Sequence, residues 1–112
     1  MDPKEHISSM KSVLDENKNL MLDYSWRVLE DYYLKPYRDL YVDFFNTYSE
    51  RFLPGTDFVA AANKNFKIYK EELEVNSQIN KHLNDKAFRN IALGENYFRL
   101  LNLNYEAPKV CK

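Results

Sequence analysis

Hydrophobic and polar residues follow a helical period along most of the chain, most clearly between Pro36 and Leu53. On a helix at 100° per residue, the aromatic side chains of this stretch fall on one side and the acidic side chains fall opposite. The apolar side consists of Tyr37, Leu40, Tyr41, Phe44, Phe45, Tyr48 and Phe52. Each aromatic ring buries roughly 150–250 Å² when it is covered. We therefore expect a helix over 36–53 whose aromatic face packs against the rest of the chain or against another molecule.

The segment before Pro36 shows a second apolar stripe. Asp2-Pro3 is typical of a helix start, with Asp as N-cap and Pro at the first helical position. The following apolar stripe, spaced by three and four residues, comprises Ile7, Met10, Leu14, Asn17, Met21, Tyr24 and Val28. This spacing is typical of a helix that packs along its length against another. Because proline disfavours helical geometry in the residue before it, the pattern predicts a helix over 3–35 and a corner at Pro36.

The second half of the chain begins after Pro54-Gly55, which indicates a turn. Thr56 or Asp57 is then expected to cap a long third helix over 57–93. Asn84-Asp85 is a further capping pair and predicts a possible break that divides this helix into 57–83 and 85–93. Gly94 is expected to end it, which leaves a short last helix over 95–103.

Together these segments predict an all-α fold, an elongated helical bundle of three to four helices over 3–35, 36–53, 57–93 and 95–103. Residues 1–104 form one helical domain in this interpretation, and 105–112 form a C-terminal tail without helical pattern. The whole chain has only two glycines and four prolines, too few for the many tight turns of a sandwich or barrel.

Three asparagines, Asn17, Asn65 and Asn76, occupy positions that the period assigns to packed faces. One interpretation is that they fix helix register, as an asparagine in a coiled-coil seam does. The other is that these faces are only partly buried and the amides reach water.

Composition narrows the class of protein. The 112 residues suffice for one domain with its own core, and the net charge of −1 is too small to indicate a phosphate-binding surface. The single cysteine, Cys111, excludes an internal disulfide and favours a reducing, cytoplasmic setting; a nuclear or viral context stays open. No apolar run approaches the length of a membrane span.

No catalytic, cofactor or metal motif is present in the sequence. His6 and His82 have no second histidine or cysteine at ligand spacing, and Cys111 lies in the tail with no base placed beside it. We therefore expect a non-enzymatic protein without cofactor or metal.

The surplus of aromatic residues indicates a protein–protein interaction module, a small helical subunit, adaptor or inhibitor. Tyrosine and tryptophan are enriched in binding hot spots. The candidate partner-binding face consists of Trp26, Tyr33, Tyr37, Tyr41, Phe44, Phe45, Tyr48 and Phe52. The partner is another protein or a second copy of the chain; the alternative is that all these rings fit a monomeric core.

A second hypothesis is a nucleic-acid-associated protein that uses the basic side of the third helix. That side carries Lys64, Lys67, Lys70, Lys81, Lys86 and Arg89. Glutamates interspersed with these residues favour a solvated, ion-paired face instead.

Overall fold

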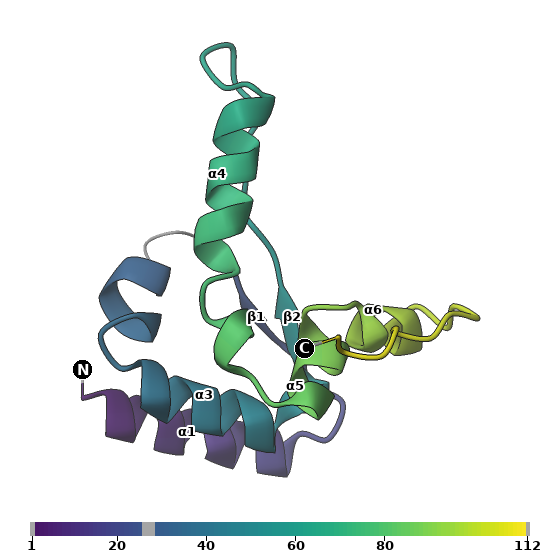
Figure 1. Cartoon of the computed structure of the whole chain (residues 1–112). Helices are drawn as coiled ribbons and strands as arrows, with labels where there is room; N and C mark the ends of the chain where they lie inside the picture. Colours follow the sequence, from purple (N-terminus) through teal and green to yellow (C-terminus); the bar gives the residue numbers. More distant parts are fainter. Residues whose placement is uncertain (1, 26–28, 112) are drawn as a thin grey trace.

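The structure is a computed structural model of the chain and describes residues 2–25 and 29–111. Helices flank a two-stranded parallel sheet, so the molecule is a mixed α/β fold and the predicted all-α bundle of three to four helices is wrong. In Figure 1, helices lie on both sides of the sheet and form a body, and one helix rises away from that body as an arm.

The first helix begins as predicted and ends early. α1 (Pro3–Glu16) has Asp2 as its N-cap, and Asp2 Oδ1 accepts a hydrogen bond from the main-chain N–H of Lys4 at 3.2 Å. Its buried side, with Ile7 and Leu14, packs against the helix that follows Pro36. The predicted helix over 3–35 is thus wrong beyond residue 16.

Two asparagines, placed by the period on packed faces, cap helices instead. Asn17 is the C-cap of α1, and its side-chain amide donates to the carbonyl of Val13 at 2.8 Å, a local bond that competes with helix continuation. Asn65 is an exposed N-cap whose Oδ1 accepts from Ile68 N at 3.1 Å. Neither fixes a helix register; the side chain of Asn76 lies outside the described part of the chain.

The sheet joins β1 (Leu22–Tyr24) to β2 (Phe52–Pro54), with Leu22 opposite Phe52 and Tyr24 opposite Pro54. Arg51, just before β2, fixes the chain that enters β1. Its guanidinium donates to the carbonyls of Leu14, Asn17 and Leu20 at 3.2, 2.5 and 2.8 Å. Strands of three residues are too short to show an alternating pattern, which is why helical spacing obscured them.

The connection from β1 to β2 contains the aromatic stretch. It includes the π-helix η1 (Glu30–Leu34), helix α3 (Arg38–Thr47) and the 3-10 turn η2 (Ser49–Arg51). Pro36 lies in the turn before α3 rather than inside the helix, so the predicted span 36–53 is too long at both ends.

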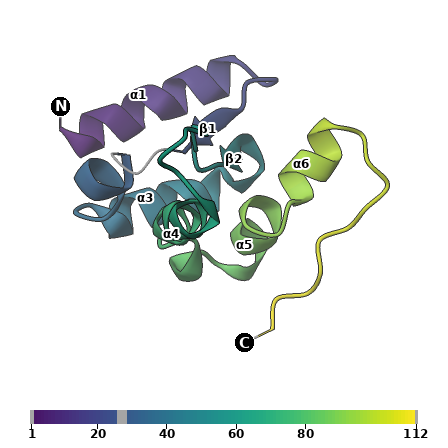
Figure 2. The ribbon, with the colours of Figure 1, turned by 90° about the horizontal axis from the view of Figure 1, so that it is seen from above.

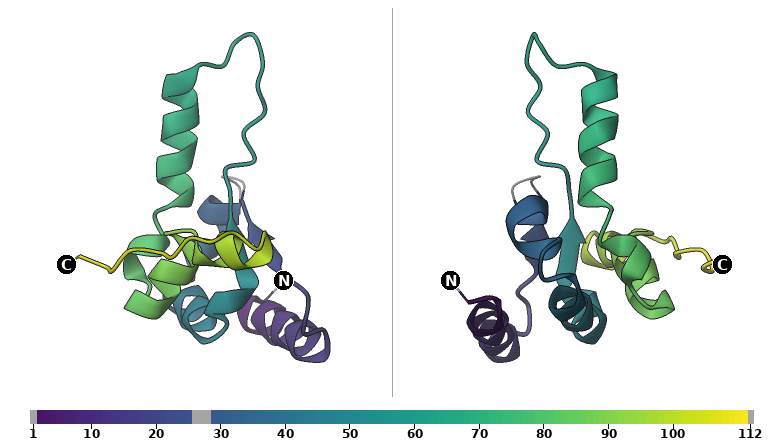
Figure 3. Two further views of the ribbon diagram at one scale, coloured as in Figure 1. Left: turned by 90° about the vertical axis from the view of Figure 1, so that its right-hand side faces the viewer. Right: turned by 60° about the vertical axis from the view of Figure 1, so that its left-hand side comes forward.

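The predicted helix over 57–93 is also wrong. Thr56 Oγ1 accepts from Phe58 N at 3.1 Å, and Asp57 has a positive φ of 55°, so this pair forms a turn instead of a helix cap. Residues 55–65 are extended or turned, and α4 (Phe66–Asn76) returns beside them to the body. Figure 3 shows both pieces projecting together as the arm, which we define as residues 55–76.

The chain after the arm folds back onto the body. Residues 77–83, which we call the neck, contain η3 (Asn80–His82). They lead to α5 (Asp85–Ile91), and Asn84 caps α5 by accepting from Ala87 N at 2.8 Å. A helix thus starts at Asp85, where the sequence allowed for a break, but the expected pieces 57–83 and 85–93 are wrong, because α4 ends at Asn76 and α5 ends at Ile91.

The last helix, α6 (Glu95–Leu100), is shorter than the predicted 95–103 and follows Gly94, whose φ of 90° favours glycine. The tail has no helix, as its pattern predicts, but it is fixed to the body. Ala107 is buried, and Arg89 of α5 donates to the carbonyls of Ala107 and Pro108 at 2.8 and 3.0 Å. Figure 2 shows this return of the tail past α5.

Candidate functional site

The structure divides the predicted partner-binding face. Tyr41, Phe44, Phe45 and Phe52 are buried in the chain's own core. Tyr48 is half-buried and donates to Asp15 Oδ1 at 3.0 Å. Tyr33 and Tyr37 are exposed, and Trp26 lies outside the described residues.

The four buried rings cover one another in specific geometries. Phe52 lies edge-on to Phe44 and Phe45, with ring centroids 5.1 and 4.6 Å apart, and Tyr24 of β1 stacks on Phe45 at 4.8 Å. Such pairs contribute about 0.5–1.5 kcal/mol each beyond the burial of area. These rings therefore hold the sheet against α3 and are closed to a partner in the folded chain.

The exposed apolar surface lies instead on the arm. None of the described side chains of α4 is buried. Phe66, Tyr69 and Leu73 follow the spacing i, i+3, i+7 and share one side of the helix; we call them the arm stripe. Phe66 is 76% exposed and Leu73 is 47% exposed.

Short contacts brace the arm against its own extended limb. Phe58 lies edge-on to Tyr69 with centroids 5.3 Å apart, and Lys64 Nζ lies 5.1 Å from the centre of the Phe58 ring. Lys64 also pairs with Glu72 at 3.4 Å. The arm is thus a defined hairpin of one extended and one helical limb, with the tip ring of Phe66 left open.

The basic side of the arm is paired with its own carboxylates. Lys67 lies 4.0 Å from Glu71, and Lys70 lies 3.7 Å from Glu74, both at the spacing i, i+4. Such exposed pairs stabilise a helix by only a few tenths of a kcal/mol. They leave this surface without the excess positive charge that nucleic-acid binding requires.

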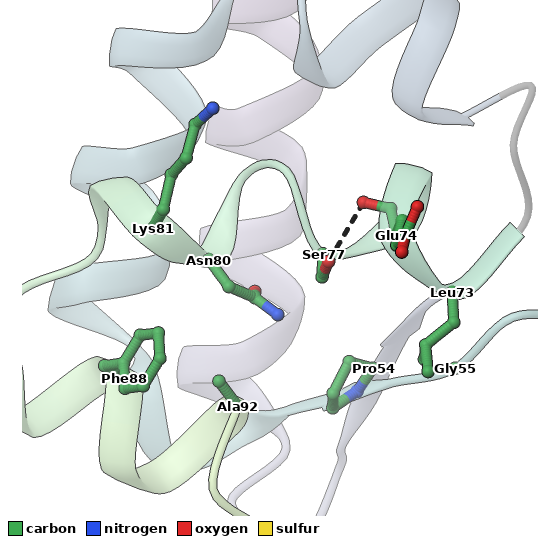
Figure 4. Close-up of a pocket in the computed structure, with 9 residues that line it drawn as sticks. All are labelled: Pro54, Gly55, Leu73, Glu74, Ser77, Asn80, Lys81, Phe88 and Ala92. Carbon is green, nitrogen blue, oxygen red and sulfur yellow. Dashed lines mark hydrogen bonds between the residues drawn. The ribbon is translucent and has the colours of Figure 1, made fainter. Parts of the chain in front are cut away.

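A groove of about 530 Å³ opens where the arm joins the body (Figure 4). Its apolar lining comes from three elements: Leu73 from α4, Pro54 from the end of β2, and Phe88 from α5. Because Leu73 belongs to the arm stripe, the apolar surface of the arm continues into this groove.

The groove also has a polar lining, to which Asn80 of η3 contributes. The buried hydroxyl of Tyr24 donates to Asn80 Oδ1 at 2.5 Å. Burial raises the pKa of Tyr24 far above its usual value, so the hydroxyl stays protonated and keeps this bond. The bond joins the neck of the arm to β1 and fixes the base from which the arm projects.

A second pocket, of about 410 Å³, has the neck in its wall and is lined mainly by charged residues. Glu30 of η1 lines it and is only 4% exposed, and among the described residues nothing lies within hydrogen-bonding distance of its Oε2 atom. Burial, followed by the neighbouring charge of Asp31, raises the pKa of Glu30 to about 7, although Lys35 and Lys81 act in the opposite direction.

Sequence reasoning missed both Glu30 and the arm stripe. A glutamate in a charged stretch carries no sign of burial, and only the crossover between the strands places it in a pocket. Tyr69 and Leu73 fit the apolar period of the expected third helix, but a period does not reveal whether another element covers a face.

Other candidate chemistry is sparse over the described residues. They include no group of three or more His, Cys, Asp or Glu side chains that is able to hold a metal ion. His6 Nδ1 lies 3.0 Å from the Tyr41 hydroxyl, and Cys111 is exposed in the tail. Across residues 2–25 and 29–111, no helix has the length and apolar character of a membrane span.

The arm stripe, the groove and the Glu30 pocket are therefore the features on which a function has to be argued. Their geometry is the available guide, since comparisons with protein-family models, curated proteins and solved structures found no match to this chain.

Proposed function

We propose that this protein is a non-enzymatic protein-binding module whose contact surface is the arm stripe and the groove at its base. The observation that carries this proposal is that α4 projects from the body with none of its described side chains buried, although Phe66 and Leu73 are apolar and exposed. The partner is a protein with an apolar segment, either a second copy of the chain or a different protein.

The size of the exposed surface supports this role. The chain exposes 7743 Å², whereas a compact monomer of this mass exposes about 6,500 Å². The excess of about 1,200 Å² is larger than the area of about 800 Å² that each partner contributes to a standard interface. A partner that covers the arm would therefore bury enough surface for specific association.

The short length of α4 also supports a protein-binding role. Helices shorter than about 12–15 residues are marginal in water without tertiary packing, and α4 has 11 residues. Its Asn65 cap and its paired charges supply part of the missing stability. Apolar contacts from a partner along the arm stripe would supply the rest.

Two expectations from the sequence, an aromatic contact face and a reducing setting, are compatible with this proposal. The exposed Tyr33 and Tyr37 remain available as the outer part of the aromatic face. The single cysteine is compatible with a reducing, cytoplasmic setting.

The test replaces Phe66 and Leu73 by aspartate, one at a time. Sedimentation velocity over a wide concentration range measures self-association, and cross-linking in cell extract measures capture of other proteins. We expect each variant to keep the circular dichroism spectrum of the wild type and to weaken association by about 2 kcal/mol or more, roughly 30-fold.

The matched control is Leu100→Asp, which adds the same charge at an apolar position of α6 that is 54% exposed. It is expected to associate like the wild type. The proposal fails if the arm variants retain every partner of the wild type, or if the wild type forms no complex in either assay.

A further inference from the structure

The pocket that contains Glu30 presents a buried acceptor, Glu30 Oε2, for which the described residues supply no donor. Glu30 Oε2 has no hydrogen-bond partner among the described residues, and the residue is almost completely buried. A buried carboxylate oxygen without a donor is costly because it has lost its water and gained nothing in exchange. A ligand that donates a hydrogen bond here would recover that loss.

The rest of the pocket is predominantly basic. Lys35, Arg38, Lys81 and His82 line it together with the two carboxylates of Glu30 and Asp31. Arg38 is paired with Asp39 at 3.2 Å, so Lys35 and Lys81 are the lysines of this pocket that we assign to a negative group of the ligand. Among the described residues, the Lys81 ammonium donates to Gln78 Oε1 at 3.1 Å, and an ammonium group has two further donors for such a group.

One wall of the pocket is apolar, so we expect the ligand to carry an apolar group beside its two charged groups. Val75 of α4 and Ile79 of the neck contribute aliphatic side chains. A volume of about 410 Å³ is in the range of small-molecule sites.

We propose that this pocket binds a small zwitterion with an aliphatic side chain, of the class of a free α-amino acid. Its ammonium group donates to Glu30 Oε2, its carboxylate lies against Lys35 and Lys81, and its side chain lies against Val75 and Ile79. The inference is independent of the protein-binding role of the arm, because neither Phe66 nor Leu73 lines this pocket.

The charges around Glu30 predict how binding depends on pH. The carboxylate form attracts an ammonium group, and the pKa of Glu30 is raised to about 7, so affinity should increase from about pH 6 to about pH 8. The titratable and charged groups that face Glu30 come from several elements: Tyr24 from β1, Asp31 and Lys35 from the η1 segment, Arg38 from α3, and Lys81 and His82 from η3. The pH dependence assigned to Glu30 has to disappear in Glu30→Gln.

The experiment uses three probes that differ by one group, measured by calorimetry on the full chain. L-leucine carries both charges, 3-methylbutylamine lacks the carboxylate, and 4-methylpentanoate lacks the ammonium. We expect leucine to bind roughly ten-fold or more tightly than either analogue, because each charge-assisted hydrogen bond is lost in one of them.

Two variants assign the ends of the ligand. Glu30→Gln should weaken leucine roughly ten-fold or more and leave 4-methylpentanoate unchanged, whereas Lys35→Gln should weaken leucine and 4-methylpentanoate and leave 3-methylbutylamine unchanged. Glu50→Gln, at an exposed position of η2, is the control for loss of one negative charge.

Three results would overturn the proposal: no binding of leucine, equal binding of leucine and 4-methylpentanoate, or unchanged leucine binding in Glu30→Gln. The arm variant Phe66→Asp is expected to bind leucine like the wild type. Failure of this inference is thereby distinguished from failure of the protein-binding proposal.

Discussion

Replacement of Glu30 by glutamine should stabilise the free protein at alkaline pH and leave its stability unchanged at acidic pH. Glutamine has nearly the shape of the glutamate and never ionises. Glu30 has an ordinary pKa of 4.5, which the folded protein raises to about 7, chiefly through burial. The folded state therefore holds a proton on this carboxyl between about pH 4.5 and pH 7, where the unfolded chain has released it.

The sign and size of the effect follow from this difference in proton binding. Because the folded state binds more protons, the contribution of Glu30 to stability is complete below about pH 4.5 and is lost as the pH rises toward 7. A shift from 4.5 to about 7 corresponds to at most about 3 kcal/mol at 1.36 kcal/mol per pKa unit. Since the pocket opens to solvent, we expect Glu30→Gln to gain about 2 kcal/mol at pH 8.

Urea unfolding followed by far-ultraviolet circular dichroism, repeated between about pH 4.5 and pH 8, measures this gain. The quantity to compare is the difference between variant and wild type at each pH, because other carboxylates change the stability of both proteins alike. Glu50→Gln reports the effect of removing one exposed charge. A difference that stays constant with pH, or a variant that is less stable than the wild type at pH 8, would refute the argument that an ionised Glu30 is strained in its pocket.

Two further predictions concern residues that hold the body together. Phe44→Ala should lower the free energy of unfolding by about 3–5 kcal/mol, because the ring is fully buried. Tyr37→Ala, at the exposed end of the aromatic face, should change it by less than about 0.5 kcal/mol. Equal losses in urea unfolding would contradict the division of that face into core and surface. Arg51→Met should cost about 2–3 kcal/mol, because its guanidinium binds three carbonyls between Leu14 and Leu20; an unchanged urea midpoint would show that these bonds do not hold α1 against the sheet.

Two helix starts were predictable, because a cap depends on a few neighbouring residues, whereas the cap expected at Thr56 or Asp57 is a turn. Asp2-Pro3 and Asn84 were identified from the sequence and cap α1 and α5. The buried rings of α3 were also visible as a period. Their role as core rather than contact surface was left open, because the period does not show which chain covers a face.

The sheet and the arm could not be predicted for a different reason. β1 has three residues and exists because Arg51 and β2, about thirty residues later, hold it in place. The run Ala60-Ala61-Ala62 has high helix propensity, yet it forms no helix: Ala62 lies in a turn and all three side chains are exposed, so packing does not offset the cost of starting a helix. A local sequence pattern shows neither the long-range pairing of strands nor the lack of a packing partner for a segment.

The two candidate surfaces meet at the neck, and this geometry limits how they can influence each other. Lys81 lines both the groove and the Glu30 pocket, and Val75, at the base of α4, lines the pocket as well. A ligand bound to Glu30 would contact the base of the arm. The ring of Phe66 lies at the tip, about two helical turns from Leu73. Coupling between small-molecule and protein binding would therefore act through the groove and not through the tip, so leucine should change the association of Phe66→Asp more than that of Leu73→Asp.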